Sequence, residues 1–191
     1  SSGAYVDISN NAAAVHGGGA LLNGGNEFFI SGNETRLDVN NNTANGNGAG
    51  IYVAAASIEV SSARVNINFN TALNLYRKDQ TGIALEYGGG GLFFRDEGTR
   101  LDVYDSNSRL LVNNNVAKEK TGGGIALRLG AVVRVTAPST FHGNTAATGS
   151  GGGLGYDDNG GEEDGVATCT RLSMYVFIDG DKNNINLEHG N

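Results

Sequence analysis

The chain has 191 residues, which is enough for one domain with a sizeable hydrophobic core. Its formal net charge of −7 argues against binding nucleic acid or an anionic membrane through bulk charge, and it has no apolar run of about 18 residues that would insert into a bilayer. Glycine occurs 31 times and proline once, while Val, Ile, Leu, Phe and Tyr recur in short alternating runs. This composition predicts a β-rich protein with many tight turns.

The chain repeats a short pattern five times. Each copy has an apolar residue, an Asn three positions later, and an Ala two positions after that Asn. The asparagines are Asn11, Asn42, Asn70, Asn115 and Asn144, and the apolar residues are Ile8, Val39, Ile67, Val112 and Phe141. A Gly cluster and a second apolar run follow each copy. The Asn-to-Asn spacings are 31, 28, 45 and 29 residues, which indicates a unit of 28–31 residues with an insertion at about residues 73–87 in the third copy.

A unit of this length, made of strands and turns only, predicts one coil of a solenoid. A helical repeat would need apolar residues at a spacing of 3.6 and few glycines, and a propeller blade usually needs about 40 residues or more. We therefore predict an all-β fold, a single-stranded right-handed parallel β-helix of about five to six coils with three short strands each. Residues 1–156 form the predicted β-helix, and residues 157–191 form an acidic loop and C-terminal strands that continue or cap it.

Stacking of such coils, about 4.8 Å apart, places equivalent residues in columns. The apolar residues before each Asn form one predicted inward column, and a second comprises Ala20, Ile51, Leu92, Ile125 and Leu154. The five asparagines form a third column at a turn, where each side-chain amide bonds its neighbours or nearby backbone. We therefore predict a structural role for the asparagines, and we assign no catalytic residue.

Two motifs of the repeat resemble those of the polymorphic outer membrane proteins of chlamydiae, which are autotransported adhesins. Phe141-His142-Gly143-Asn144 matches the Phe-x-x-Asn form, and Gly18-Gly19-Ala20-Leu21 matches the Gly-Gly-Ala-[Ile/Leu/Val] form. The other copies carry Ile or Val for Phe, or Gly for Ala. The resemblance covers roughly residues 5–156, and it implies a right-handed β-helix with a surface-displayed, non-catalytic, adhesive or structural role.

An enzyme is the alternative, because the parallel β-helix also serves pectin-lyase-like polysaccharide lyases, hydrolases and epimerases. Acid–base chemistry on a glycosidic bond needs carboxylates that face one cleft. Asp157-Asp158 is an isolated pair, His142 is far from it in sequence, and His16, His142 and His189 each precede Gly, which favours turns. The pattern therefore favours a protein without catalysis.

Two acidic segments suggest a Ca²⁺ site, the only cofactor that the sequence suggests. Asp157 and Asp158 open a loop rich in carboxylates, and Asp179, Asp181 and Asn183 have the alternating spacing that begins an EF-hand-like loop. A solvated loop and a turn between strands explain the same residues. Glycosylation acceptor patterns occur at Asn33 and Asn41. The single cysteine, Cys169, excludes an internal disulfide and lacks a metal-site spacing.

We therefore expect an extracellular or cell-surface module that is part of a larger surface protein or assembly. Its expected partners are other protein subunits, extracellular matrix or host glycans, with no nucleic acid and no insertion into a membrane. Binding is expected to use flat β faces on which Tyr52 and Phe93 are exposed.

Overall fold

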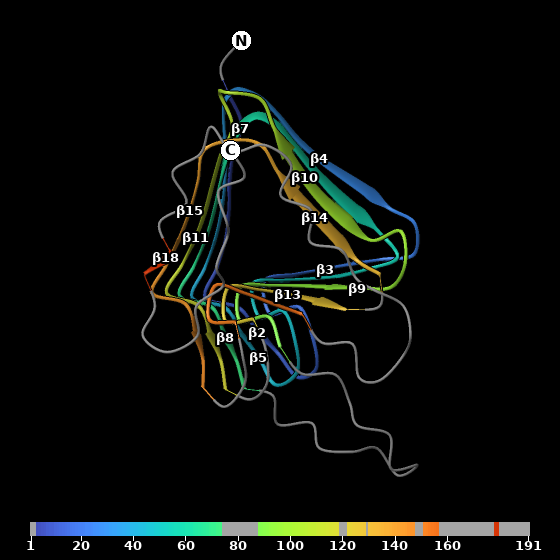
Figure 1. Ribbon diagram of the computed structural model, residues 1–191, viewed down its shortest axis with the longest axis vertical. Helices are drawn as coiled ribbons and strands as arrows, with labels where there is room; N and C mark the ends of the chain where they lie inside the picture. Colours follow the sequence, from blue (N-terminus) through green and yellow to red (C-terminus); the bar gives the residue numbers. More distant parts are fainter. Residues whose placement is uncertain are drawn as a thin grey trace, which may run out of the picture.

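The computed structural model describes residues 3–73, 88–118, 122–128, 130–147, 151–156 and 178–179. Within these ranges every regular element is a β-strand, and the strands pair in parallel. The chain coils through three parallel sheets, so the predicted parallel β-helix is confirmed. Viewed along the stack, the sheets enclose a triangular section (Figure 1).

The first sheet supplies two sides of the triangle. Its strands are β1 (Tyr5–Ser9), β4 (Glu27–Asn40), β7 (Ser57–Asn68), β10 (Arg100–Tyr104), β11 (Arg109–Asn113), β14 (Val132–Val135), β15 (Ser139–His142) and β18 (Ile178–Asp179). β4 and β7 each bend around the corner between the two sides, where Glu34 and Ser62 take φ angles of 69° and 52°. In the next coil the corner residue is Asp105 (φ 70°), and the strand divides there into β10 and β11.

The other two sheets are made of short strands stacked in the same order. One contains β2 (Ala12–Ala13), β5 (Thr43–Ala44), β8 (Thr71–Ala72), β12 (Val116–Ala117) and β16 (Thr145–Ala146). The other contains β3 (Ala20–Asn23), β6 (Ile51–Ala54), β9 (Leu92–Arg95), β13 (Ile125–Arg128) and β17 (Leu154–Tyr156) and forms the base of the triangle in Figure 1.

The number of coils differs from the prediction. The chain makes about four turns instead of five to six. Five copies of the repeat occupy five levels, and only four turns separate five levels. Of the C-terminal segment that was expected to continue or cap the solenoid, the structure describes only β18, which pairs with β15 beyond the fifth copy. The rest of residues 157–191, and residues 74–87 of the predicted insertion, lie outside the described ranges.

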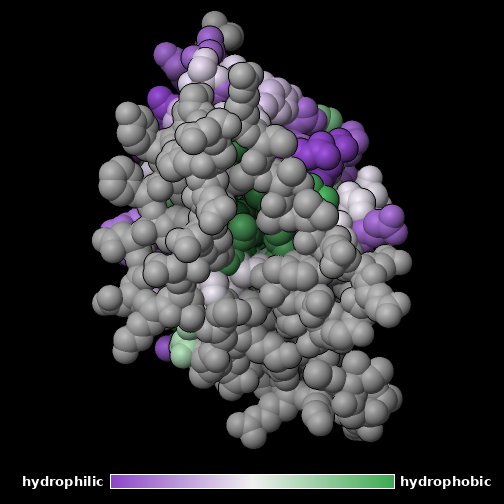
Figure 2. Space-filling view, in the orientation of Figure 1, coloured by the Kyte–Doolittle hydropathy of each residue, from purple (hydrophilic) through white to green (hydrophobic). Residues whose placement is uncertain are grey.

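The two predicted apolar columns fill the interior. Strand register aligns Ile8, Val39, Ile67, Val112 and Phe141 in one column, and Ala20, Ile51, Leu92, Ile125 and Leu154 in the other. Val39, Ile67 and Val112 have no exposed surface. Burial of each such side chain contributes about 1.5–3 kcal/mol. Figure 2 shows hydrophobic side chains at the centre of the section and hydrophilic ones along its rim.

The five repeated asparagines form a hydrogen-bonded column, here called the asparagine ladder (Asn11, Asn42, Asn70, Asn115 and Asn144). The backbone N–H and the side-chain Nδ2 of Asn42 both donate to Oδ1 of Asn70, each at 3.0 Å, and Nδ2 also donates to the Ile8 carbonyl at 2.8 Å. The Asn70 and Asn115 amides repeat this arrangement one and two coils on. Each interior amide thus uses both donors, and its oxygen accepts two hydrogen bonds.

A column of glycines is required beside the ladder. A Cβ atom on Gly50 would lie 2.4 Å from the Gly91 carbonyl oxygen and 3.1 Å from Nδ2 of Asn70. Gly91 and Gly124 stand equally close to Asn115 and Asn144. The Gly cluster of each repeat therefore makes room for the amide of the ladder as well as turning the chain.

We predict that Asn70→Ala lowers the free energy of unfolding by about 3 kcal/mol or more, because it leaves the donors of Asn42 and the Val39 carbonyl without partners in the interior. The matched control is Asn40→Ala, which removes one half-exposed amide hydrogen bond and should cost about 1 kcal/mol or less. Urea denaturation followed by circular dichroism measures both, and equal losses would contradict the structural role of the ladder.

Candidate functional site

Four of the five residues of the asparagine ladder are buried and inaccessible to a ligand, whereas Asn11, at the first level, is exposed. Asn42, Asn70 and Asn115 have no exposed surface, and Asn144 is 7% exposed. Their hydrogen-bonding groups are bonded within the solenoid. A binding site must therefore be sought on the outer faces of the strands.

The acidic segments predicted to bind Ca²⁺ lie almost entirely outside the described ranges. Asp157, Asp158, Asp181 and Asn183 lie outside the described ranges, and for Asp179 only the place of its backbone in β18 is described. Among the residues that are described, no group of three or more His, Cys, Asp or Glu side chains could hold a metal ion. Within the same residues, no helix is long and apolar enough to cross a membrane.

The two predicted glycosylation acceptors are on the surface. Asn33 is exposed in the bend of β4, and Asn41 is exposed directly before the buried Asn42. Attachment of a glycan at either position stays a prediction.

The expected exposure of Tyr52 and Phe93 is wrong. Both side chains point outward from the base of the triangle, but Tyr52 is 5% and Phe93 is 2% exposed. Their rings stack on each other at 5.3 Å between centroids, and the His16 ring stacks on Tyr52 at 4.7 Å. Aromatic residues at equivalent positions of adjacent coils cover each other's faces, so this surface is a second apolar cluster rather than a binding face.

His16 has a structural role in this cluster. Its Nδ1 accepts a hydrogen bond from the backbone N–H of Asn47 at 3.0 Å. Burial lowers the pKa of His16, and the positive charge of Arg95 lowers it further. Both effects favour the neutral imidazole that this hydrogen bond requires.

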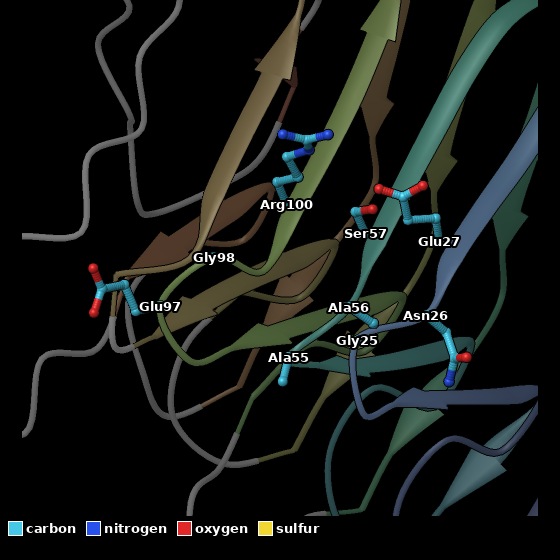
Figure 3. Close-up of a pocket in the computed structure, with 9 residues that line it drawn as sticks. All are labelled: Gly25, Asn26, Glu27, Ala55, Ala56, Ser57, Glu97, Gly98 and Arg100. Carbon is cyan, nitrogen blue, oxygen red and sulfur yellow. The ribbon is translucent and has the colours of Figure 1, made fainter.

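A shallow groove of about 310 Å³ lies where the base meets β4, β7 and β10. Its charged lining residues are Glu27, Glu97 and Arg100, and Ser57 lies between Glu27 and Arg100 in the strand register. Figure 3 shows the Glu27 carboxylate near Ser57, whereas the Glu97 side chain points away from that side of the groove. The two carboxylates therefore do not converge as acid and base would on one bond.

A column of arginines marks a different outer surface. We call this surface the arginine face. It is the outer side of β1, of residues 36–40 in β4, of residues 64–68 in β7, and of β11. Strand register places Tyr5, Arg36, Arg64 and Arg109 in one column across four consecutive coils. Each alternates with inward residues, such as Leu37 beside Arg36, and all three arginines are exposed. Adjacent guanidinium groups therefore start from backbones about 4.8 Å apart.

Asp38 fixes the first arginine of this column. Its Oδ1 accepts from Nε of Arg36 at 2.8 Å, and its Oδ2 lies 2.7 Å from Nη2 of the same guanidinium. Tyr5 and Asn66 also donate to this carboxylate. Burial of Asp38 opposes its ionisation, but the hydrogen bonds from Arg36, Asn66 and Tyr5 outweigh that effect and lower its pKa. The Arg36 guanidinium lies 5.6 Å from the centre of the Tyr5 ring.

The opposite margin of the arginine face carries amides and one exposed aromatic ring. Asn40, Asn68 and Asn113 form a half-exposed column, in which Asn68 donates to Asn40 at 3.1 Å. The next residue in this coil, Phe69, is 56% exposed and has a φ of 58°. A bulky side chain is strained in this left-handed region, and the corresponding residues in the other copies are Asn10, Asn41, Asn114 and Gly143, which tolerate it.

The arginine face was not predicted from the sequence, although the repeat contains a signal for it. The residue six positions before the ladder asparagine is Tyr5, Arg36, Arg64, Arg109 or Pro138 in successive copies. Alignment of the five copies at that outward position would have revealed three arginines in register. The same alignment one position before the Asn would have shown Phe69 among asparagines and a glycine.

The corner between β10 and β11 contains the carboxylate of Asp105, which accepts several hydrogen bonds. Oδ1 of Asp105 accepts from the backbone N–H groups of Asn107 and Ser108, and Oδ2 accepts from the N–H of Ser62 in the preceding coil at 2.7 Å and from the Ser61 hydroxyl at 3.0 Å. Desolvation raises the pKa of this carboxyl, but the hydrogen bonds have the larger and opposite effect, and they lower the pKa to about 2.

Three parallel sheets that coil around one apolar interior, with a residue pattern that repeats at each level, define a parallel β-solenoid repeat protein. Residues 36–54, from the second half of β4 to the end of β6, match the model of the Chlamydia polymorphic membrane protein repeat. The resemblance predicted from the two sequence motifs is thereby confirmed for this copy of the repeat. No curated protein and no solved structure matches the chain.

We predict that Asp105 stabilises the fold in a pH-dependent manner. Its folded-state pKa of about 2 is below the ordinary value of about 3.9, so its contribution is complete above that ordinary value and is lost as the pH falls through the window between the two. The difference in unfolding free energy between the wild type and Asp105→Asn should shrink across this window in urea titrations. A difference that stays constant from about pH 5 to pH 2 would contradict the assignment.

Proposed function

We propose that the chain is a surface-displayed, non-catalytic β-solenoid module of a larger protein or assembly, with an adhesive or structural role outside the cell. The match of residues 36–54 to the Chlamydia polymorphic membrane protein repeat supports surface display. The regular register of the strands supports an adhesive role, because it makes a rigid scaffold on which outward side chains recur at fixed intervals.

The observation that carries the proposal is the arginine face. Its side chains are held by strands and by hydrogen bonds such as those of Asp38 with Arg36, so they require little ordering when a partner binds. A flat, in-register array suits an extended partner better than a small substrate. The expected partners are therefore extracellular glycans or matrix proteins.

A carbohydrate-active enzyme is the second candidate, and the groove near Glu27, Ser57, Glu97 and Arg100 is the observation that favours it. Carboxylates and an arginine are groups that such enzymes use. However, hydrolysis needs two carboxylates at either side of one bond, and Glu27 and Glu97 are not directed toward a common point (Figure 3).

Binding and turnover assays distinguish the two candidates. We expect the purified chain to be retained by at least one class of polysaccharide on a glycan array, and to release no unsaturated or reducing-end sugars from pectin, alginate or hyaluronan. We also expect an antibody against the chain to label intact, unpermeabilised cells of its source. Sugar release that is lost in Glu27→Gln would establish the enzyme instead, and labelling only after permeabilisation would contradict surface display.

A further inference from the structure

We propose that the arginine face binds an acidic polysaccharide, with the sugar chain running along the column of Arg36, Arg64 and Arg109, across the coils. This inference rests on the proposed adhesive function and names the class of ligand and the surface that receives it. Carboxylate or sulfate groups of the polysaccharide pair with the guanidinium groups, and its hydroxyls and ring faces contact the neighbouring amides and aromatic rings.

Two of the three arginines are free to pair with an anion. The ion pairs of the described part of the chain include Arg36 but neither Arg64 nor Arg109. Arg64 donates through Nε to Asn66 at 3.2 Å, and Arg109 donates through Nη1 to the Ser106 and Ser108 carbonyls. These bonds orient each guanidinium and leave other N–H groups for a ligand. In a chain of net charge −7, two adjacent guanidiniums without a carboxylate partner are a local site for an anion.

The spacing of the column favours a polymer with regularly placed anionic groups. The arginines lie on consecutive coils, about 4.8 Å apart, and the backbone of each is held in a parallel ladder. A single anion would contact one or two of them. A polysaccharide with an anionic group on successive or alternate sugars contacts the whole column with one extended chain.

The non-ionic groups of the face indicate a sugar chain rather than another polyanion. The Nδ2 groups of Asn40 and Asn113 donate no hydrogen bond within the described residues, so they are available to sugar hydroxyls. The exposed Tyr5 ring lies at one end of the arginine column, and Phe69 lies about 17 Å along the strand from Arg64. Both present an apolar ring surface.

Phe69 provides independent support. Its backbone strain and its 56% exposure both reduce stability, and Asn at the same position would avoid both. A strained, exposed aromatic residue at the margin of a face that carries a cationic column is typical of a binding surface in which function opposes stability.

The test compares variants of the full chain on immobilised heparin and hyaluronan by surface plasmon resonance, with dextran as the neutral glycan and single-stranded DNA as a polyanion without sugar acid groups. Arg64→Gln and Arg109→Gln should each weaken binding to the acidic glycan about tenfold, because each removes charge-assisted hydrogen bonds. Arg134→Gln is the matched control: it removes another exposed strand arginine, from the other side of the triangle, on β14, and should change binding less than twofold. Binding should also weaken as salt is raised.

Phe69→Asn separates binding from folding. We expect this variant to unfold at a higher temperature than the wild type and yet to bind the acidic glycan several-fold more weakly, a combination that a folding defect cannot produce. Unchanged affinity of Phe69→Asn for the acidic glycan would contradict a role of Phe69 in binding.

Three outcomes overturn the proposal: equal losses in Arg64→Gln and Arg134→Gln, equal affinity for single-stranded DNA and the acidic glycan, or no affinity for either acidic glycan. If the wild type binds a neutral glycan on the array instead, the adhesive function stands and only the acidic ligand is wrong. If it binds no glycan at all and labels no cell surface, the proposed function itself fails.

Discussion

The fold depends on the complete hydrogen bonding of a buried primary amide. An asparagine side chain in an apolar interior needs partners for two donors and for its oxygen, and each group without a partner costs about 1–3 kcal/mol. Here the partners of Asn70 are the Val39 carbonyl of the preceding coil, the amide and backbone N–H of Asn42, and the amide oxygen of Asn115. Each coil satisfies its neighbour only if it carries the same residue at the same level. The requirement therefore fixes the register of the whole stack.

The fixed register determines what the outer surface can present. Since the apolar columns and the asparagine ladder hold every level in place, outward residues align across coils with no requirement on their own chemistry. Three arginines align on one face, whereas aromatic rings align on the base and bury each other. The same scaffold thus yields an exposed cationic column or a closed apolar cluster, depending only on whether the aligned side chains repel or attract one another.

The fold could be predicted from the sequence because its determinants repeat. The spacing of Asn, Ala and Gly, with apolar residues at Ile8, Val39 and their equivalents, indicated strands, turns and the inward columns. The exposure of Tyr52 and Phe93 could not be predicted in the same way. Alternation along a strand shows that a residue points outward, but burial there depends on contacts between coils and with His16, a residue from another part of the chain.

The candidate site was hidden for a related reason. The arginines are 28 and 45 residues apart, and nothing in the local sequence around Arg64 distinguishes it from an ordinary solvated arginine. Only the register turns them into a column. Likewise the strain at Phe69 is a backbone property, which the sequence suggests only when the other copies are placed beside it. The parallel β-helix and its inward apolar columns, which follow from the period, agree with the structure, whereas the exposure of Tyr52 and Phe93, which depends on contacts between coils, does not.

The amides of the ladder share one polarity: each side-chain nitrogen donates to the amide oxygen of the following coil, and each side-chain oxygen accepts from the amide of the preceding one. A stack with this polarity can gain or lose a whole coil by duplication or deletion of one repeat in its gene, because the new junction reproduces the bonds of the old one. Evolution can therefore change the length of such a rod, and diversify its outer residues copy by copy, without having to reinvent its interior.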